Sequence, residues 1–301
     1  MMDANRPDLL DPASLAALGR LEVVARWVVD GFLTGLHRSP RKGFSVEFAD
    51  HRPYQPGDDL RYLDWKIAAR ADRWVIKQFE EATNLRAMLL LDVSPSMAWS
   101  GSPERLTKLA WAEAAIAALS LLVLRQRDAV GFIRFDDAVR TVLPPRARTA
   151  QWRRVLAELG QVGTGSETAL AVAVERAAAL VTRPGLIVIV SDLLVEPEEA
   201  ARAVRTLRAV GHDIVVLHVM DPAEQDLAEA GDALFTDPES GDALAARGSD
   251  VRTAYRLTVE TAIGEWRERF AGVGAFYDVV TTDAPFGTAL RRAFAVRQGL
   301  P

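Results

Sequence analysis

Oxygen-bearing side chains gather where apolar runs of the sequence end. They are Asp92, Ser94 and Ser96 after the run 87–91, Thr164 in the glycine-containing loop 163–168, and Asp192 after the run 186–190. Carboxylate and hydroxyl oxygens are hard ligands of the kind that Mg²⁺ takes in near-octahedral geometry. The alternating positions 92, 94 and 96 allow one turn to aim three side chains at one point. The pattern predicts a Mg²⁺ or Mn²⁺ site, and because only two of its five ligands are carboxylates, it would favour one more anionic oxygen from outside.

Each of these pieces also has an ordinary structural explanation. A Ser-x-Ser turn or a Ser-Asp pair after a strand is common as a helix cap. Thr168 competes with Thr164 for the role of threonine ligand. The metal site is favoured by the joint occurrence of all the pieces, in this order and at the ends of predicted strands.

The elements that must position these residues alternate regularly from residue 86. Strands are expected at 87–92, 129–135, 139–143, 186–190, 214–219 and 276–280, with helices at 103–125, 149–159, 167–181, 198–210, 253–270 and 287–297. Strands that are apolar throughout and alternate with helices predict an α/β fold, a doubly wound and mostly parallel sheet with helices on both faces. Ligands bind such sheets at the carboxyl ends of the strands. The helix 167–181 is expected to be capped around Ser166.

The chain is expected to divide at residue 85. Residues 1–85 form an N-terminal segment with a helix over 9–36 followed by a β-rich stretch, and residues 86–301 form the sheet domain with a hairpin insertion near 232–245. The stretch 57–66 carries Asp58, Asp59, Arg61, Asp64 and Lys66 beside Trp65. We interpret it as an internal salt-bridge network, with a partner contact as the alternative.

The predicted ligands resemble a known metal site. Asp92-x-Ser94-x-Ser96, Thr164 and Asp192 are similar to the metal-ion-dependent adhesion site of von Willebrand factor type A domains. This resemblance implies that the serines and the threonine face the metal, while the acids bind it directly or through water. The sequence departs from the family pattern at Val162 and Leu193, where many relatives have glycine, and neither departure removes a ligand.

The stretch 54–81, above all Gly57-Asp58-Asp59-x-Arg61-x-x-Asp64-Trp65-Lys66, resembles the bacterial family called domain of unknown function 58. That family joins such a segment to a von Willebrand type A domain and is commonly linked to MoxR-type AAA+ ATPases. The resemblance covers roughly residues 35–290. It implies a non-enzymatic adaptor or co-chaperone that docks a carboxylate of a partner protein, such as the ATPase, on its Mg²⁺ site.

The composition of the chain limits the kinds of site, partner and location that are possible. The 301 residues contain no cysteine and four histidines, which excludes thiolate sites, and the net charge of −5 argues against nucleic acid as a partner. No apolar stretch approaches the roughly 20 residues that cross a bilayer, so we expect a soluble, cytoplasmic protein without a membrane span. The acidic stretch 224–250 is interpreted as solvated, or alternatively as a docking surface.

Two other functions stay open at this point. A Mg²⁺-dependent hydrolase or phosphotransferase is disfavoured, because the chain has no Gly-x-Ser-x-Gly or P-loop motif and has Ser94 where a haloacid-dehalogenase-type site needs an acid. A structural domain with a vestigial site is the other alternative.

Overall fold

The computed structural model describes residues 21–37, 51–54, 67, 74–77, 85–160, 165, 168–227, 232–236 and 243–287. The chain forms two compact units, one of residues 38–84 and one of the remainder. The predictions for residues 9–20, 38–50, 57–66 and 288–297 fall outside the described residues. In the smaller unit, β1 (His51–Pro53) pairs antiparallel with β2 (Val75–Lys77).

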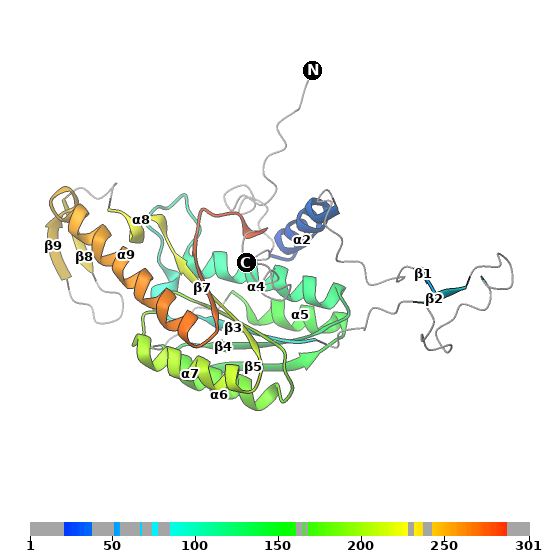
Figure 1. Ribbon diagram of the computed structural model, residues 1–301. Coiled ribbons are helices and arrows are strands. Elements are labelled where there is room, and N and C mark those ends of the chain that lie inside the picture. Colours follow the sequence, from blue (N-terminus) through cyan, green and yellow to red (C-terminus); the bar gives the residue numbers. More distant parts are fainter. Residues whose placement is uncertain are drawn as a thin grey trace, which may run out of the picture. The chain divides into compact units, whose positions relative to one another are not determined.

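The larger unit is built on a six-stranded sheet (Figure 1). Its strands are β3 (Arg86–Asp92), β4 (Ala129–Phe135), β5 (Val139–Arg146), β6 (Leu186–Ser191), β7 (Asp213–Met220) and β10 (Phe276–Thr281). They lie in the order β10-β7-β6-β3-β4-β5. Neighbouring strands are parallel except β4 and β5, which are antiparallel. The predicted fold class, a mostly parallel α/β sheet with helices on both faces, is confirmed.

Helices cover the two faces of the sheet because successive side chains of a strand point to opposite faces. Leu89 and Leu91 of β3 join the core beneath α2 (Leu21–His37), α4 (Lys108–Arg125) and α5 (Thr149–Glu158). Met88 and Leu90 join the core beneath α6 (Leu170–Leu180), α7 (Pro197–Ala209) and α9 (Gly248–Gly272). Figure 1 shows α4 and α5 on one side of the strands, with α6 and α7 on the other. Trp111 of α4 and Trp152 of α5 are both buried in the first of these cores.

Helix α2 belongs to the sheet unit, so the contacts group the chain differently from the predicted division at residue 85. Val24, Ala25, Val28 and Val29 form an apolar stripe on this helix and are all buried in the core shared with α4. An amphipathic helix must cover its apolar face, and the side of α4 away from the sheet supplies the cover. The smaller compact unit therefore consists of residues 38–84 alone.

Two helices begin later than the sequence pattern predicts. Helix α4 begins at Lys108 because the Thr107 hydroxyl accepts a hydrogen bond from the N–H of Ala110 at 3.1 Å and caps it. Helix α6 begins at Leu170, and its N-cap residue Ala169 makes no side-chain cap. The N–H of Ala169 instead donates to the carbonyl oxygen of Asp136, 2.6 Å away at the end of β4. The prediction of a cap around Ser166 was therefore wrong.

Four short elements complete the described part of the larger unit. A 3-10 helix, η2 (Pro95–Ala98), follows β3, and helix α8 (Pro222–Gln225) follows β7. Strands β8 (Asp232–Thr236) and β9 (Ala243–Arg247) pair antiparallel where the hairpin was predicted.

Candidate metal centre

The candidate site lies beside β3, the strand from which the chain adds later strands first on one side and then on the other. From β3 the chain continues through α4 to β4 on one side, whereas β6 pairs with β3 on the other side. Leu91 and Val190 are register partners, so Asp92 and Asp192 emerge at the same carboxyl edge of two adjacent strands. This is the crevice in which open α/β sheets bind ligands.

Asp92 is held by the turn that follows its strand. Its Oδ1 accepts a hydrogen bond from the N–H of Ser94 at 2.9 Å, and its Oδ2 accepts one from the hydroxyl of Ser191 at 2.6 Å. The hydroxyls of Ser94 and Ser96 lie 3.1 Å apart, and both side chains are buried. The turn therefore gathers a carboxylate and two hydroxyls in a space shielded from bulk water.

The two carboxylate oxygens of Asp192 have different surroundings. Its Oδ2 accepts a hydrogen bond from the ammonium of Lys108 at 2.8 Å. Its Oδ1 is buried and has no hydrogen-bond partner among the described residues. A buried carboxylate oxygen without a partner is costly, so this atom marks a position where a cation or a donor would be stabilised.

Lys108, Glu224 and Ser191 were not predicted from the sequence as residues of this site. The ammonium of Lys108 also binds Oε1 of Glu224 at 2.6 Å, although the two residues are 116 positions apart. The interpretation of 224–250 as a solvated stretch was wrong for Glu224, which pairs with the buried Lys108. Asp226 pairs with Arg252, and both side chains are partly exposed. A lone lysine at the start of a mostly apolar helix was the signal that could have pointed to this pairing.

Burial and charge shift the pKa values around the site. Burial, followed by the negative charge of Asp192, raises the pKa of Asp92 to about 7, and the hydrogen bonds from Ser191 and Ser94 only partly offset this. Burial would lower the pKa of Lys108, but the charges of Asp192 and Glu224 outweigh it and raise that pKa. Burial also raises the pKa of Glu224 above its usual value. The cluster is thus short of positive charge.

The donor set present fits a divalent cation. With all groups ionised, Asp92, Asp192 and Glu224 carry three negative charges and Lys108 one positive charge, which leaves a net charge of −2. A divalent cation would neutralise this charge, and hydroxyl and carboxylate oxygens are its preferred ligands.

The threonine ligand is not assigned by the structure. Thr164 lies outside the described residues, whereas Thr168 is described and its buried hydroxyl has no hydrogen-bond partner among them. Within the described ranges, no group of three or more His, Cys, Asp or Glu side chains forms a metal site.

Apolar side chains stand exposed beside the candidate ligands. Trp99, just after η2, is 41% exposed, and Leu194, two residues after Asp192, is 53% exposed. Large apolar side chains at a polar site are typical of protein-contact surfaces, in which apolar anchors surround a specific polar contact. We call Trp99 and Leu194 the apolar rim.

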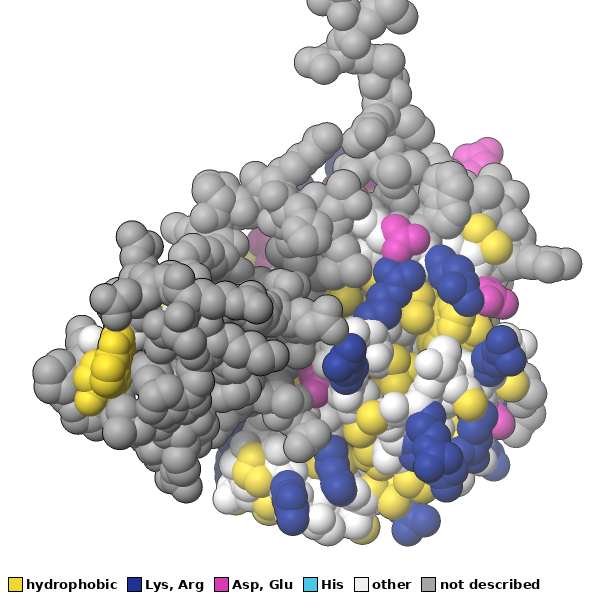
Figure 2. All heavy atoms as spheres, turned by 90° about the vertical axis from the view of Figure 1, so that its right-hand side faces the viewer, with side chains coloured by type: hydrophobic (Ala, Val, Ile, Leu, Met, Phe, Trp, Pro, Cys, Tyr) yellow, Lys and Arg dark blue, Asp and Glu magenta, His cyan; other side chains and the backbone are white. Residues whose placement is uncertain are grey.

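Basic side chains mark the opposite edge of the sheet. The register pairs Arg86 with Ala129 and Arg146 with Val130, which places both arginines at the amino end of the parallel strands. Figure 2 shows Lys and Arg side chains spread among apolar ones on one face of the molecule. The acidic carboxyl edge and these arginines therefore lie at opposite ends of the strands.

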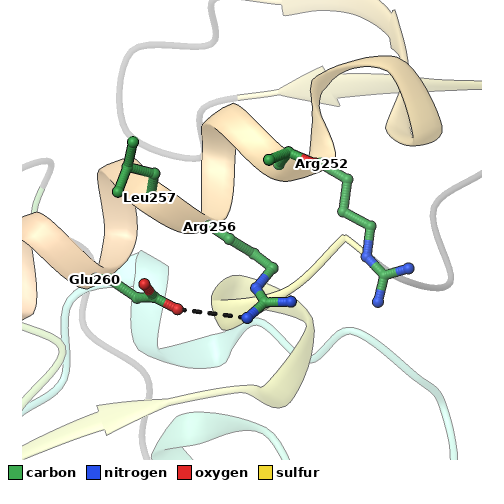
Figure 3. Close-up of a pocket in the computed structure, with 5 residues that line it drawn as sticks. Arg252, Arg256, Leu257 and Glu260 are labelled. Carbon is green, nitrogen blue, oxygen red and sulfur yellow. Dashed lines mark hydrogen bonds and ion pairs between the residues drawn. The ribbon is translucent and has the colours of Figure 1, made fainter.

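A separate hollow of about 510 Å³ runs along α9 and is lined by Arg252, Thr253, Arg256, Leu257 and Glu260 (Figure 3). Arg252 makes two hydrogen bonds to Asp226, at 2.6 and 2.7 Å, and Arg256 lies 3.5 Å from Glu260. Both guanidinium groups thus already have acidic partners within the chain.

Comparison with known proteins places the chain in a family. The family model described as "Protein of unknown function DUF58" matches residues 50–267. The "Uncharacterized protein Rv1480" of Mycobacterium tuberculosis is 32% identical over 239 residues, which span 78% of this chain and 74% of that protein. The "Uncharacterized protein Mb1516" of Mycobacterium bovis matches to the same extent.

Among solved structures, the conserved hypothetical protein BatB from Bacteroides thetaiotaomicron has a TM-score of 0.47 and 19% identity, covering 71% of this chain and 98% of that one. An aerotolerance-related membrane protein from Bacteroides fragilis has a TM-score of 0.49 and 21% identity, covering 71% and 97%. Within the part of this chain that the structure describes, no helix combines the length and apolar character needed to cross a membrane.

Proposed function

The chain belongs to the DUF58 family, and we propose that it is a metal-dependent protein-interaction module rather than an enzyme. The observation that carries this proposal is the pair of carboxylates, Asp92 and Asp192, at the ends of adjacent strands, where one buried oxygen of Asp192 has no hydrogen-bond partner in the part of the chain that the structure describes. Such a site is short of a cation.

Five side chains are proposed as the ligands of Mg²⁺ or Mn²⁺: Asp92, Ser94, Ser96, Thr164 and Asp192. The two serine hydroxyls and both carboxylates are buried at the carboxyl edge of the sheet. When bound, the cation would supply a positively charged position at which a carboxylate of a protein partner can be held. The apolar rim would add specificity, since Trp99 and Leu194 are exposed beside the ligands.

The partner that we propose is a MoxR-type AAA+ ATPase or its client, as the resemblance to the DUF58 family implies. The chain would then act as an adaptor or co-chaperone, and an acidic side chain of the partner would be the group recognised. Phosphate-ester hydrolysis is not part of the proposal. Burial lowers the pKa of His218 to about 4, so this histidine is a poor base at neutral pH. Its Nδ1 is also hydrogen-bonded to the hydroxyl of Tyr277 at 2.8 Å.

Calorimetric titration with Mg²⁺ and Mn²⁺ tests the metal site. We expect binding to the wild type and none to Asp92→Ala. The matched control is Asp213→Ala, because Asp213 lies at the opposite edge of the sheet, where its partner is Arg208. Equal binding to the wild type and to Asp92→Ala would refute the assignment.

A pull-down with the cognate ATPase, with and without EDTA, tests the docking role. We expect capture only with metal, and reduced capture by Asp92→Ala and Ser94→Ala. Trp99→Ser should weaken capture while leaving Mg²⁺ affinity unchanged. Capture that persists in EDTA and with both ligand variants would place the interaction elsewhere.

One observation favours a second function, a structural domain with a vestigial site. The ammonium of Lys108 already supplies a cation to Asp192 at 2.8 Å. A domain of this kind would bind neither Mg²⁺ nor Mn²⁺, so the same titration separates the two functions.

A further inference from the structure

Lys108 is an unusual residue in this chain. Of the 36 Lys and Arg residues only four are lysines, and Lys108 is the only lysine after Lys77. Its side chain is 2% exposed, and its ammonium lies between Asp192 and Glu224 at 2.8 and 2.6 Å. A compact ammonium on a flexible stem can contact two converging carboxylates, whereas arginine carries a wide planar fork. The space between the two carboxylates therefore favours lysine over arginine, although most basic residues of this chain are arginines.

Glu224 continues this contact into a second region. Its Oε2 accepts a hydrogen bond from the N–H of Asp221 at 2.7 Å, and its carbonyl oxygen accepts one from the Tyr255 hydroxyl of α9 at 2.8 Å. Asp226, one residue past α8, is bound twice by Arg252, which lines the hollow in Figure 3. We call these residues, Asp221, Glu224, Asp226, Arg252 and Tyr255, the α8–α9 corner.

We propose that Lys108 is a positioning residue that couples cation binding at the candidate metal centre to the α8–α9 corner. The proposal rests on the proposed metal site and adds a route from it. Without a divalent cation, the ammonium must balance Asp192 as well as Glu224. A cation beside Asp192 takes over part of that charge and repels the ammonium, which then commits to Glu224. Metal binding therefore tightens the corner.

Coupling of this kind must work in both directions. If Mg²⁺ strengthens the contact between Lys108 and Glu224, removing the charge of Glu224 must weaken Mg²⁺ binding, because the ammonium then stays with Asp192. We expect Glu224→Gln to raise the Kd for Mg²⁺ about fivefold, at the lower end of the range of about 5- to 150-fold for coupled sites. Glu265→Gln is the matched control, since Glu265 lies on α9, is exposed and pairs with the exposed Arg269.

Hydrogen exchange of the backbone amides reads the coupling directly. In the wild type, saturating Mg²⁺ should slow exchange at Asp221, Ala223 and Glu224 about fivefold, the same coupling factor as for Mg²⁺ affinity. The variant Lys108→Met/Glu224→Gln loses one positive and one negative charge, so the net charge of the cluster stays at −2. This variant should still bind Mg²⁺ but show no slowing at these amides.

The outcomes separate the two proposals. Failure of the wild type to bind Mg²⁺ in calorimetry overturns both. Binding without any change in exchange at the corner overturns the coupling alone, and so does slowing that survives in the double variant. If the double variant does not fold, as judged by circular dichroism, Glu224→Gln decides the matter: an unchanged Kd for Mg²⁺ refutes the coupling, and a fivefold rise that Glu265→Gln does not reproduce supports it.

Discussion

Replacing Asp92 with asparagine should make the metal-free protein more stable at pH 8. The pKa of this buried carboxyl is raised to about 7, whereas an unfolded chain has the ordinary value of 3.8. Between these two values the folded protein holds a proton that the unfolded chain has released. The contribution of Asp92 to stability in metal-free buffer is therefore fully present below pH 3.8 and is lost as the pH rises to about 7. Asparagine removes this dependence because it does not titrate.

The size of the effect follows from the two pKa values. Each unit between 3.8 and about 7 is worth about 1.4 kcal/mol, so the ionised form costs the fold about 4 kcal/mol at pH 8. Asparagine also loses one acceptor, since both carboxylate oxygens of Asp92 accept hydrogen bonds, at a cost of about 1–3 kcal/mol. The net gain at pH 8 is about 1–3 kcal/mol. Between pH 8 and pH 5, the stability of the variant relative to the wild type should fall by about 3 kcal/mol.

Urea unfolding in EDTA at pH 8 and pH 5 measures this difference. Excess Mg²⁺ should reverse the order at pH 8, because the cation stabilises only a protein that binds it. A stability difference between variant and wild type that is equal at the two pH values would refute the reasoning. It would show that the Asp92 carboxylate is not held ionised at a cost in the metal-free fold.

Three further predictions concern Asp136, Thr164 and the lack of hydrolytic activity. For Asp136, burial would raise the pKa, but hydrogen bonds from Arg140 and from nearby backbone N–H groups outweigh it and lower the pKa to about 2. Asp136→Asn should therefore cost about 2 kcal/mol at pH 7, a loss that shrinks as the pH falls from about 4 towards 2, in urea unfolding. Thr164→Ala should raise the Kd for Mg²⁺ roughly tenfold without lowering the Tm in EDTA; the same effect from Thr168→Ala instead would give the ligand role to Thr168. The pure protein should not hydrolyse phosphate esters with Mg²⁺ or Mn²⁺, and turnover that Asp92→Ala abolishes would contradict this.

The elements that are apolar throughout were predictable from the sequence because their pattern reflects burial on both faces of the sheet. Strand β6, Leu186–Ser191, is buried at every position, and its neighbour β3 is buried at all but the first. Parallel pairing of two such strands brings their carboxyl ends together, so Asp92 and Asp192 could be assigned to one edge without coordinates.

The surroundings of that edge could not be predicted because long-range contacts form them. Lys108 opens a helix, where a lysine is ordinarily solvated, and its partners lie 84 and 116 positions away. The start of α6 depends on a bond from Ala169 to the carbonyl oxygen of Asp136, and a local capping pattern gives no sign of that bond.

Leu193, directly after Asp192, has a left-handed backbone with φ of 54°. For a residue with a side chain this conformation costs about 1–2 kcal/mol. The side chain is 3% exposed and packs in the core beneath α6 and α7, a burial worth about 1.5–3 kcal/mol. The N–H of Leu193 also donates to the hydroxyl of Ser191 at 2.9 Å. Burial thus offsets the strain, and the turn that presents Asp192 forms without glycine.

This balance predicts an unusual order of stability for two truncations of Leu193. Leu193→Ala loses the buried side chain and keeps the backbone strain, whereas Leu193→Gly loses the side chain and relieves the strain. A protein with glycine at a given position is ordinarily less stable than one with alanine there by roughly 0.5–1 kcal/mol, because glycine loses more conformational freedom on folding. Here Leu193→Gly should equal or exceed Leu193→Ala in urea unfolding, with both variants below the wild type. A glycine variant that is clearly the least stable of the three would show that residue 193 is not strained in the folded protein.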